Sequence, residues 1–341
     1  MTRAREPGDG GRGMAVVAPN WLGDAVMSLS AIAALGNKRG VAVLARPYTA
    51  RVFWNAPGVS DVWIDPPGGR IRRIRARAGS LRAYGADAAV ILPPSFSGAL
   101  APYLAGVSVR VGFATGGRMP LLSDAVALPP RTRHLTMSYL DLAARALGHD
   151  VEESPARLTV SAADRAAAVG RLNAAGVRGA FALVVPGAAF GPAKAWPWER
   201  YQSLCRALAA ELPVVLSGGS GDRDVCARIA AGITGVVDVC GRTGLGEFFA
   251  LAERASVLVA NDSGAPHVSA ALGTPTVVLF GSTSPAWTAP RGPAVRVLQH
   301  VVHCNPCFGR TCPTALECFN GIAVEDVLTA ARQSLDPPVT G

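Results

Sequence analysis

Short apolar runs alternate along the chain with segments of helical periodicity. In the first half, continuous runs of Val, Ile, Leu and Ala predict buried strands, and apolar positions spaced three or four residues apart predict helices between them. The expected strands are Met14–Ala18, Val41–Ala45, Asp61–Ile64, Ala88–Leu92 and Val109–Phe113, and the expected helices are Ala25–Leu35, Gly98–Ala105, Thr136–Leu147 and Ser161–Ala175.

The second half repeats the same alternation. It predicts strands at Ala180–Val185, Val214–Ser217, Val236–Val239, Val257–Ala260 and Thr276–Phe280, and helices at Trp198–Glu211, Asp222–Ala231, Gly246–Ala255, Ala265–Leu272 and Ala323–Ser334. Strands that are apolar throughout and separated by helices are typical of parallel sheets covered on both faces. The sequence therefore predicts an α/β protein with two Rossmann-like, doubly wound parallel-sheet domains.

A glycine-containing segment, Gly176–Gly179, marks the expected domain boundary. We expect a disordered extension over residues 1–13, a first domain over 14–178 and a second over 179–341. Ligands of such folds bind at the carboxyl ends of the strands, so the cleft between the domains is the expected site.

Composition excludes several classes of protein. Half of the 341 residues are hydrophobic and 17% are charged, which excludes an intrinsically disordered chain. No apolar run reaches the ~18 residues of a membrane-spanning helix. The first residues carry charge without an apolar core, so we expect no secretory signal, a cytoplasmic location and reduced thiols.

The net charge of +9 is unevenly divided. Residues 1–178 hold 22 Lys and Arg against 12 Asp and Glu, whereas residues 179–341 hold 11 against 12. The first half should therefore attract an anion, which leaves nucleic acid, a phospholipid surface and an acidic sugar lipid as alternatives to a merely solvated basic surface.

Six arginines fall within thirteen residues of this basic half. No aromatic residues are interleaved as single-stranded nucleic acid would require, so anionic lipid headgroups or an anionic acceptor fit better. A solvated helix face remains the alternative. The arginines are Arg70, Arg72, Arg73, Arg75, Arg77 and Arg82.

The first chemical motif is Asn20-Trp21-Leu22-Gly23-Asp24, directly after the first strand. Gly23 permits a tight turn, and Asp24 then stands at a helix N-terminus facing the cleft. An ordinary helix-capping aspartate is the alternative. The G-x-G-x-x-G pattern is missing, which argues against a dinucleotide-dependent dehydrogenase.

A Gly- and Pro-rich loop, Pro186–Pro197, contains Lys194, the only lysine of the second half. A flexible ammonium on such a loop suits a diphosphate, although the spacing is not that of a Walker loop and a surface lysine is the alternative. Asn261–His267 follows another strand, and the backbone N–H groups of the next helix would form an anion-binding site there. Asp262 and Ser263 as simple caps, and His267 as a core residue, are the alternatives.

Four cysteines lie close together near the C-terminus. Their spacing, Cys304-x2-Cys307-x4-Cys312-x5-Cys318, allows a metal site, disulfides or free thiols. Cys205, Cys226 and Cys240 are expected to fill the core.

Six stretches, taken in order, resemble the lipopolysaccharide heptosyltransferases of glycosyltransferase family 9, with heptosyltransferase II as the closest branch. They are NWLGDAVMSLSAI, ILPPSFSGALAPYLAGVSVRVGF, PGAAFGPAKAWP, ANDSGAPHVSAALGTPTVVLFGSTSP, HCNPCFGRTCP and the following Cys318. The resemblance implies the GT-B fold, in which two such domains face each other across the active site. It also implies an ADP-heptose donor in the second domain and, in the first, a lipid-linked acceptor from the lipopolysaccharide inner core. Heptosyltransferase I, or another sugar-nucleotide transferase of this fold, is the alternative.

The resemblance assigns roles to matched residues. Asp24 would be the base that deprotonates the acceptor hydroxyl, and Lys194 would contact the donor diphosphate as ADP leaves. Inversion in a single displacement is implied, with no cofactor and no metal. The donor site would include Asp222 (ribose), Thr243 (adenine), Asp262, Ser263, Gly264 and His267, and the acceptor site Asn20, Ser95 and Arg118.

The same resemblance places the enzyme at the cytoplasmic surface of the inner membrane, where the arginine cluster would contact anionic lipid. No nucleic-acid partner is expected. A basic nucleic-acid-binding protein with a cysteine-bound metal is the non-enzymatic alternative, and it leaves Asp24, Lys194 and Asp262 without a role.

Overall fold

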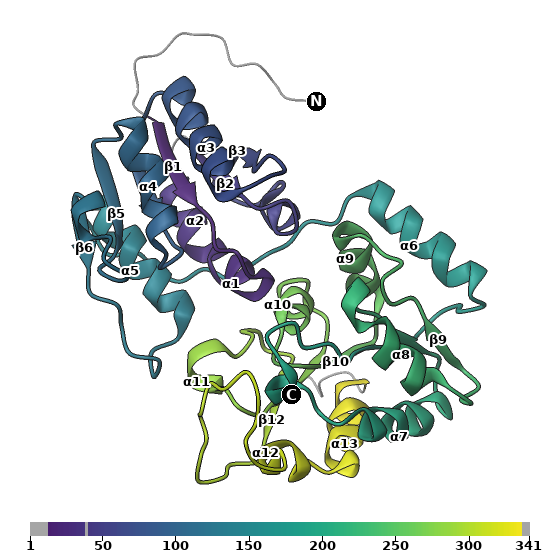
Figure 1. Cartoon of the computed structure of the whole chain (residues 1–341). Coiled ribbons are helices and arrows are strands. Elements are labelled where there is room, and N and C mark those ends of the chain that lie inside the picture. Colours follow the sequence, from purple (N-terminus) through teal and green to yellow (C-terminus); the bar gives the residue numbers. More distant parts are fainter. Residues whose placement is uncertain (1–12, 38–39, 336–341) are drawn as a thin grey trace.

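A computed structural model describes residues 13–37 and 40–335. The expected disorder of residues 1–13 lies outside the described part, except for Gly13, which is the first residue of a strand. Two lobes lie side by side, each built around one sheet (Figure 1). No helix among the described residues has the length and apolar character needed to cross a bilayer.

The first sheet has six parallel strands in the order β3-β2-β1-β4-β5-β6. This order reverses direction between β1 and β4, which creates the crevice where doubly wound folds bind ligands. The strands are β1 (Gly13–Val17), β2 (Val41–Ala45), β3 (Val59–Ile64), β4 (Ala86–Ile91), β5 (Val109–Phe113) and β6 (Asp124–Val126).

Helices cover both faces of this sheet. α2 packs beside α5, and α3 packs beside α4. The expected helix Ala25–Leu35 is divided at Ser28, whose hydroxyl donates to the Ala25 carbonyl. The helices are α1 (Leu22–Met27), α2 (Leu29–Leu35), α3 (Arg70–Tyr84), α4 (Phe96–Ala105) and α5 (Leu135–Leu147), with short 3-10 turns η1 (Ala50–Phe53) and η2 (Met119–Leu121).

The second sheet repeats the topology of the first, with parallel strands in the order β12-β11-β10-β7-β8-β9. The sequence did not predict its edge strand β12, because this strand is half-exposed and lacks a continuous buried run. The strands are β7 (Ala182–Val185), β8 (Val214–Leu216), β9 (Val236–Asp238), β10 (Val257–Asn261), β11 (Thr276–Phe280) and β12 (Val295–Gln299).

The helices of the second half surround this sheet in the same manner. α13, near the C-terminus, packs against α7, β10 and β11. The helices are α6 (Ala162–Ala174), α7 (Trp198–Ala209), α8 (Arg223–Ala230), α9 (Leu245–Arg254), α10 (Gly264–Ala271), α11 (Pro285–Thr288), α12 (Glu317–Asn320) and α13 (Val324–Leu335), with 3-10 turns η3 (Pro192–Lys194) and η4 (Ser220–Asp222).

α6 packs with the second lobe, although it precedes the predicted boundary. It lies against α9, where Arg165 pairs with Glu253 at 2.6 Å and Arg171 pairs with Glu247. Its buried side, which includes Leu172, covers that helix. The packing of the second lobe therefore begins before the boundary that the sequence placed at residues 178 and 179.

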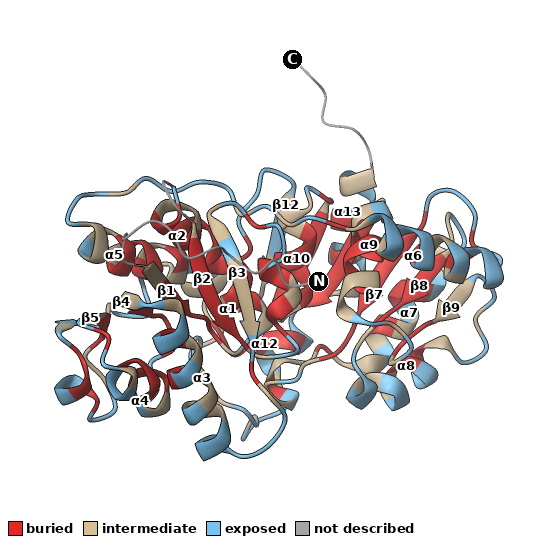
Figure 2. Cartoon of the chain, turned by 90° about the horizontal axis from the view of Figure 1, so that it is seen from above, coloured by how far each residue is buried: buried red, intermediate tan, exposed pale blue. Residues whose placement is uncertain are grey.

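Both lobes have a sheet buried on its two faces. All residues of β2, β10 and β11 are buried, as the continuous apolar runs predict. Figure 2 shows these buried strands inside each lobe and the exposed residues on the surrounding helices. The carboxyl ends of the central strands lead into the space where α1 and α10 meet.

Candidate active site between the two lobes

A cleft of about 760 Å³ lies at the carboxyl ends of the strands. The first lobe lines it with Trp21–Asp24, Pro47, Tyr48 and Arg131. The second lobe contributes the loops that follow β7, β8, β9, β10 and β11. The structure thus places Asp24, Lys194, Asp222, Thr243, Asp262, Ser263, Gly264 and His267 around one cavity.

Two glycines allow the lobes to approach each other at this cleft. A Cβ at Gly23 would lie 2.9 Å from Cδ2 of His267, and a Cβ at Gly264 would lie 2.6 Å from Cβ of Leu22. Both distances are too short for real side-chain contacts. The N-terminal turns of α1 and α10 can therefore pack together only because each carries a glycine at the contact.

Asp24 lies in the first turn of α1, where it lines the cleft. Burial raises the pKa of its carboxyl group from 3.8 to about 7. The positive charge of Lys194 opposes this rise in pKa, and the negative charge of Asp262 adds to it. A carboxylate with a pKa near neutral suits a group that must accept a proton in one step and release it in another.

Lys194 and Asp262 form a buried ion pair opposite Asp24. The Lys194 Nζ lies 2.5 Å from Oδ2 of Asp262, and the Thr283 hydroxyl donates to the same oxygen at 2.6 Å. The ammonium also lies 5.3 Å from the centre of the Phe190 ring, and the Arg310 guanidinium lies 5.4 Å from the same ring centre. These contacts hold the charged end of Lys194 in the cleft.

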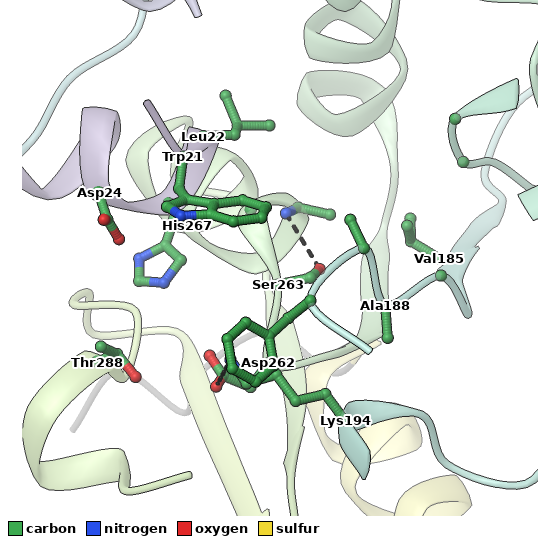
Figure 3. A pocket seen from close by; sticks show the side chains of 18 of the residues that line it. Trp21, Leu22, Asp24, Val185, Ala188, Lys194, Asp262, Ser263, His267 and Thr288 are labelled. Carbon is green, nitrogen blue, oxygen red and sulfur yellow. Dashed lines mark hydrogen bonds and ion pairs between the residues drawn. The ribbon is translucent and has the colours of Figure 1, made fainter. Parts of the chain in front are cut away.

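His267 is buried on α10 with its ring against Gly23. Burial lowers the pKa of the imidazole to about 4, further lowered by His134 and Lys194 and opposed by Asp262. The ring is therefore neutral at physiological pH. In Figure 3 the side chains of Asp24 and His267 lie next to each other, with Asp262 and Lys194 across the cavity.

The loops after β8 and β10 carry further polar groups into the cleft. The Asp222 carboxylate accepts from the Gly219 N–H at 2.8 Å, and it fits there because Gly187 and Gly218 have no side chain. Ser263 caps α10 by accepting from the Ala265 N–H at 3.4 Å (Figure 3). The free N–H groups of this helix end favour an anion.

The cleft residues that were not predicted from the sequence include Arg131, Trp287 and Phe308. The Arg131 guanidinium of the first lobe lies 4.7 Å from the centre of the Trp287 ring and 4.4 Å from that of Phe308. The two rings meet edge to face at 5.5 Å. Beside them, His134 Nε2 lies 2.9 Å from the Ala289 carbonyl oxygen, so both contacts bridge the lobes.

A second, smaller pocket of about 60 Å³ lies in the first lobe. Asn20 and Ser95, both expected to bind the acceptor, line it together with Arg70, Arg73 and Arg77 of α3. These three arginines share one helix face, because they are spaced at i, i+3 and i+7. Within this pocket the charge of Arg77 is already engaged, since it forms a bidentate pair with Asp65 at 2.6 and 2.8 Å.

Arg118 does not line either cavity, and its side chain is completely buried. Its guanidinium donates to the carbonyls of Phe113 at 2.8 Å and Pro93 at 2.5 Å. In this structure Arg118 therefore positions the loop that carries Ser95, which corrects the expectation that it contacts an acceptor directly.

The four clustered cysteines have free thiols, and they differ in environment. Cys304 and Cys307 are exposed, whereas Cys318 is buried in the second lobe. Among residues 13–37 and 40–335, the one group of three potential metal-ligating side chains within 4.8 Å is Cys226, Asp238 and Cys240. Although Cys304, Cys307, Cys312 and Cys318 are close together in the sequence, the structure does not bring three of them close enough to hold a metal ion.

Comparison with known proteins agrees with this architecture. A sequence model of the family "Glycosyltransferase family 9 (heptosyltransferase)" matches residues 74–316. Lipopolysaccharide heptosyltransferase 2 of Escherichia coli strain K12 is 30% identical over 308 residues, which cover 83% of this chain and 87% of the relative.

Two solved structures extend the comparison to the fold. ADP-heptose lipopolysaccharide heptosyltransferase II of E. coli superposes with a TM-score of 0.81 and 28% identity, covering 95% of this chain and 98% of the other. A glycosyltransferase family 9 protein from Veillonella parvula shares the fold with a TM-score of 0.83 and 20% identity, covering 95% and 97%. The chain is a GT-B protein and belongs to glycosyltransferase family 9, the heptosyltransferases.

Proposed function

We propose that this protein transfers heptose from ADP-heptose to the lipid-linked inner core of lipopolysaccharide. The second heptosyltransferase of the pathway is the favoured assignment, since the curated relatives that match most of the chain carry that name. The proposal places the enzyme at the cytoplasmic surface of the inner membrane. It requires no cofactor and no divalent metal.

The observation that carries the proposal is the arrangement of charge across the cleft. Asp24 comes from the first lobe, and Lys194 with Asp262 comes from the second. A sugar nucleotide on the second lobe would thus present its anomeric carbon toward the carboxylate of the first. Neither lobe alone contains both parts.

In the proposed reaction, the Asp24 carboxylate takes the proton of an acceptor hydroxyl. The oxygen attacks the anomeric carbon as the bond from that carbon to the ADP oxygen breaks, and one such displacement inverts the configuration. General-base assistance of this kind contributes a factor of roughly 10²–10⁴. The neutral imidazole of His267 is available to hydrogen-bond beside Asp24 without adding charge.

Lys194 and the α10 N-terminus would offset the negative charge that builds on ADP as it leaves. The Lys194 ammonium is held in the cleft by its pair with Asp262, and the helix adds the partial positive charge of its free N–H groups. These groups supply the charge that a divalent cation provides in other sugar-nucleotide enzymes. Asp222 would bind the ribose, and Thr243 would lie beside the adenine.

The acceptor would approach over the pocket lined by Asn20 and Ser95. Its arginines, Arg70 and Arg73, suit the carboxylates and phosphates of an anionic core saccharide. The positive charge of the first lobe would attract such an acceptor before contact.

Thermal unfolding with ADP, UDP and GDP tests the donor assignment. A ligand present at 100 times its dissociation constant stabilises by about 2.7 kcal/mol, so we expect an ADP-selective rise in Tm. Lys194→Ala should remove most of that rise, whereas Arg332→Ala, at an exposed ion pair with Glu211, should keep it. A preference for UDP or GDP would contradict the donor assignment.

A further inference from the structure

Large apolar side chains are exposed mainly on the first lobe. Of thirteen such side chains among the described residues, eleven precede residue 179 and two follow it. Isolated exposed apolar residues are ordinary, but a concentration on one surface marks an interaction site. The asymmetry follows that of the net charge, which is +10 before this point and −1 after it.

α4 carries three of these side chains on one face. Phe96, Tyr103 and Leu104 are 48, 48 and 46% exposed, and their spacing at i, i+7 and i+8 aligns them along the helix. Leu100 lies between them and is half-buried. We call these four residues the apolar face of α4.

The opposite side of α4 contains only small residues and proline. Gly98, Ala99, Ala101 and Pro102 are buried against the lobe. A surface helix of a soluble protein normally turns its large apolar residues inward and its polar residues outward. α4 instead turns its large apolar residues outward, which calls for a partner on its outer side.

Basic side chains border the apolar face. Arg82 of α3 donates to the Leu104 carbonyl, and the Arg110 guanidinium lies 5.7 Å from the centre of the Tyr103 ring. Farther along α3, Arg72 and Arg75 are exposed. α3 and α4 pack side by side on the same face of the first sheet (Figures 1 and 2).

Acidic residues are almost missing from this part of the chain. Asp87 is the single acidic residue between Asp65 and Asp124. A protein partner would have to cover both the apolar face and an almost wholly cationic border. An anionic bilayer supplies both complements, because it has phosphates at its surface and hydrocarbon just beneath.

We propose that the apolar face of α4 inserts into the headgroup region of a bilayer that contains anionic lipid. Arg72, Arg75 and Arg82 would then lie at the level of the lipid phosphates. The pocket of Ser95 opens at the start of the same helix, so a lipid-linked acceptor could enter it from the bilayer. Only this last step depends on the proposed function, and membrane insertion itself does not.

Vesicle flotation tests the insertion. Wild-type protein should bind vesicles of phosphatidylcholine with about 30% phosphatidylglycerol and bind pure phosphatidylcholine vesicles weakly, because the basic border adds attraction only to anionic lipid. The double variant Phe96→Ser/Leu104→Ser should lower the partition coefficient for anionic vesicles about tenfold or more, since two apolar side chains no longer enter the bilayer.

A matched control separates insertion from general loss of surface hydrophobicity. Val297→Ser/Val301→Ser removes two exposed apolar side chains of the second lobe and should bind vesicles as the wild type does. Leu104→Trp should strengthen binding, because tryptophan favours the membrane interface. It also tests the proposal if the serine variant folds poorly.

Retention of vesicle binding by a folded serine double variant, or absence of binding by the wild type, would overturn the proposal. So would equal losses in both double variants. Transfer to a short-chain, detergent-free acceptor separates this question from the proposed function. The α4 variant should retain that transfer, and failure of the wild type to transfer would count against the function while leaving the flotation result valid.

Discussion

The second lobe lines the cleft with a network of paired charges, whereas Asp24, the acidic side chain that the first lobe contributes, forms no ion pair or side-chain hydrogen bond with any of the described residues. Lys194, Asp262 and Thr283 hold one another in place before any ligand arrives. Asp24 has no such partner, and burial raises its pKa. Under the proposed function, the shared topology serves two tasks: a preorganised donor site on one lobe and a proton acceptor on the other.

The outer surfaces of the lobes also differ, in their charge and in their exposed apolar side chains. The second lobe is nearly neutral and exposes few large apolar side chains, while the first is basic and exposes many. A soluble nucleotide needs only the cleft. Under the proposed function, a lipid-linked acceptor would also need a surface that approaches its membrane, and α3 with α4 would provide that surface.

The largest effect should come from breaking the charge network of the second lobe. Lys194→Ala leaves the Asp262 carboxylate buried without its cation, which should lower the free energy of unfolding by about 3–5 kcal/mol. Lys194→Met/Asp262→Asn should recover most of the stability but not the ADP-induced rise in Tm. Chemical denaturation checks both variants, and stability unchanged in Lys194→Ala would show that the pair is not a preorganised element.

The unpaired carboxylate of the first lobe should destabilise the protein as it ionises. The folded-state pKa of Asp24 is about 7 and the reference value is 3.8, so the native state binds more protons between these pH values. Stability should therefore fall as pH rises from about 4 to 7, by a few kcal/mol, relative to Asp24→Asn. Denaturant titrations of both proteins across this range measure the difference, and parallel pH profiles would contradict the raised pKa.

Adding a side chain at the contact between the lobes should have an intermediate effect on stability. Gly264→Ala places a Cβ against Leu22, and overpacking of this kind costs about 1–3 kcal/mol. The lobes should separate and turnover should fall. Gly79→Ala is the control, because its site in α3 is open and alanine there should stabilise by about 0.5–1 kcal/mol. Small-angle scattering and melting curves compare the two, and equal behaviour would argue against a tight contact.

The smallest effect should come from the aromatic contact across the cleft. Arg131→Ala removes a cation from the faces of Trp287 and Phe308, a contact worth about 0.5–2 kcal/mol. Stability should change little, whereas KM should rise if this contact shapes the bound state. Steady-state kinetics checks this, and a loss confined to kcat would assign Arg131 to the chemical step instead.

Much of the fold was predictable because buried parallel strands leave an uninterrupted apolar run. β10 and β11 are such strands, whereas the half-exposed edge strand β12 left no signal. The sequence placed α6 within the first domain, whereas it packs with the second lobe, since its sequence shows one apolar side but not which lobe covers it.

The candidate site was predictable where a motif follows a strand, as with Asp24 and Asp262. Its electrostatics was not, because the pKa of Asp24 depends on burial by segments far away in the sequence. The contact of Arg131 with Trp287 joins residues more than 150 positions apart, and no local sequence pattern predicts it. Arg118 was misjudged for the same reason, since its burial is a tertiary property.

Transfer from ADP-heptose by wild type and Asp24→Asn tests whether the base comes from the first lobe and the donor site from the second. We expect the variant to keep the ADP-induced rise in Tm and to lose turnover by a factor of roughly 10²–10⁴. Wild-type turnover should rise with pH through about 7, as Asp24 ionises. Turnover within a few-fold of wild type in Asp24→Asn would show that Asp24 is not the base.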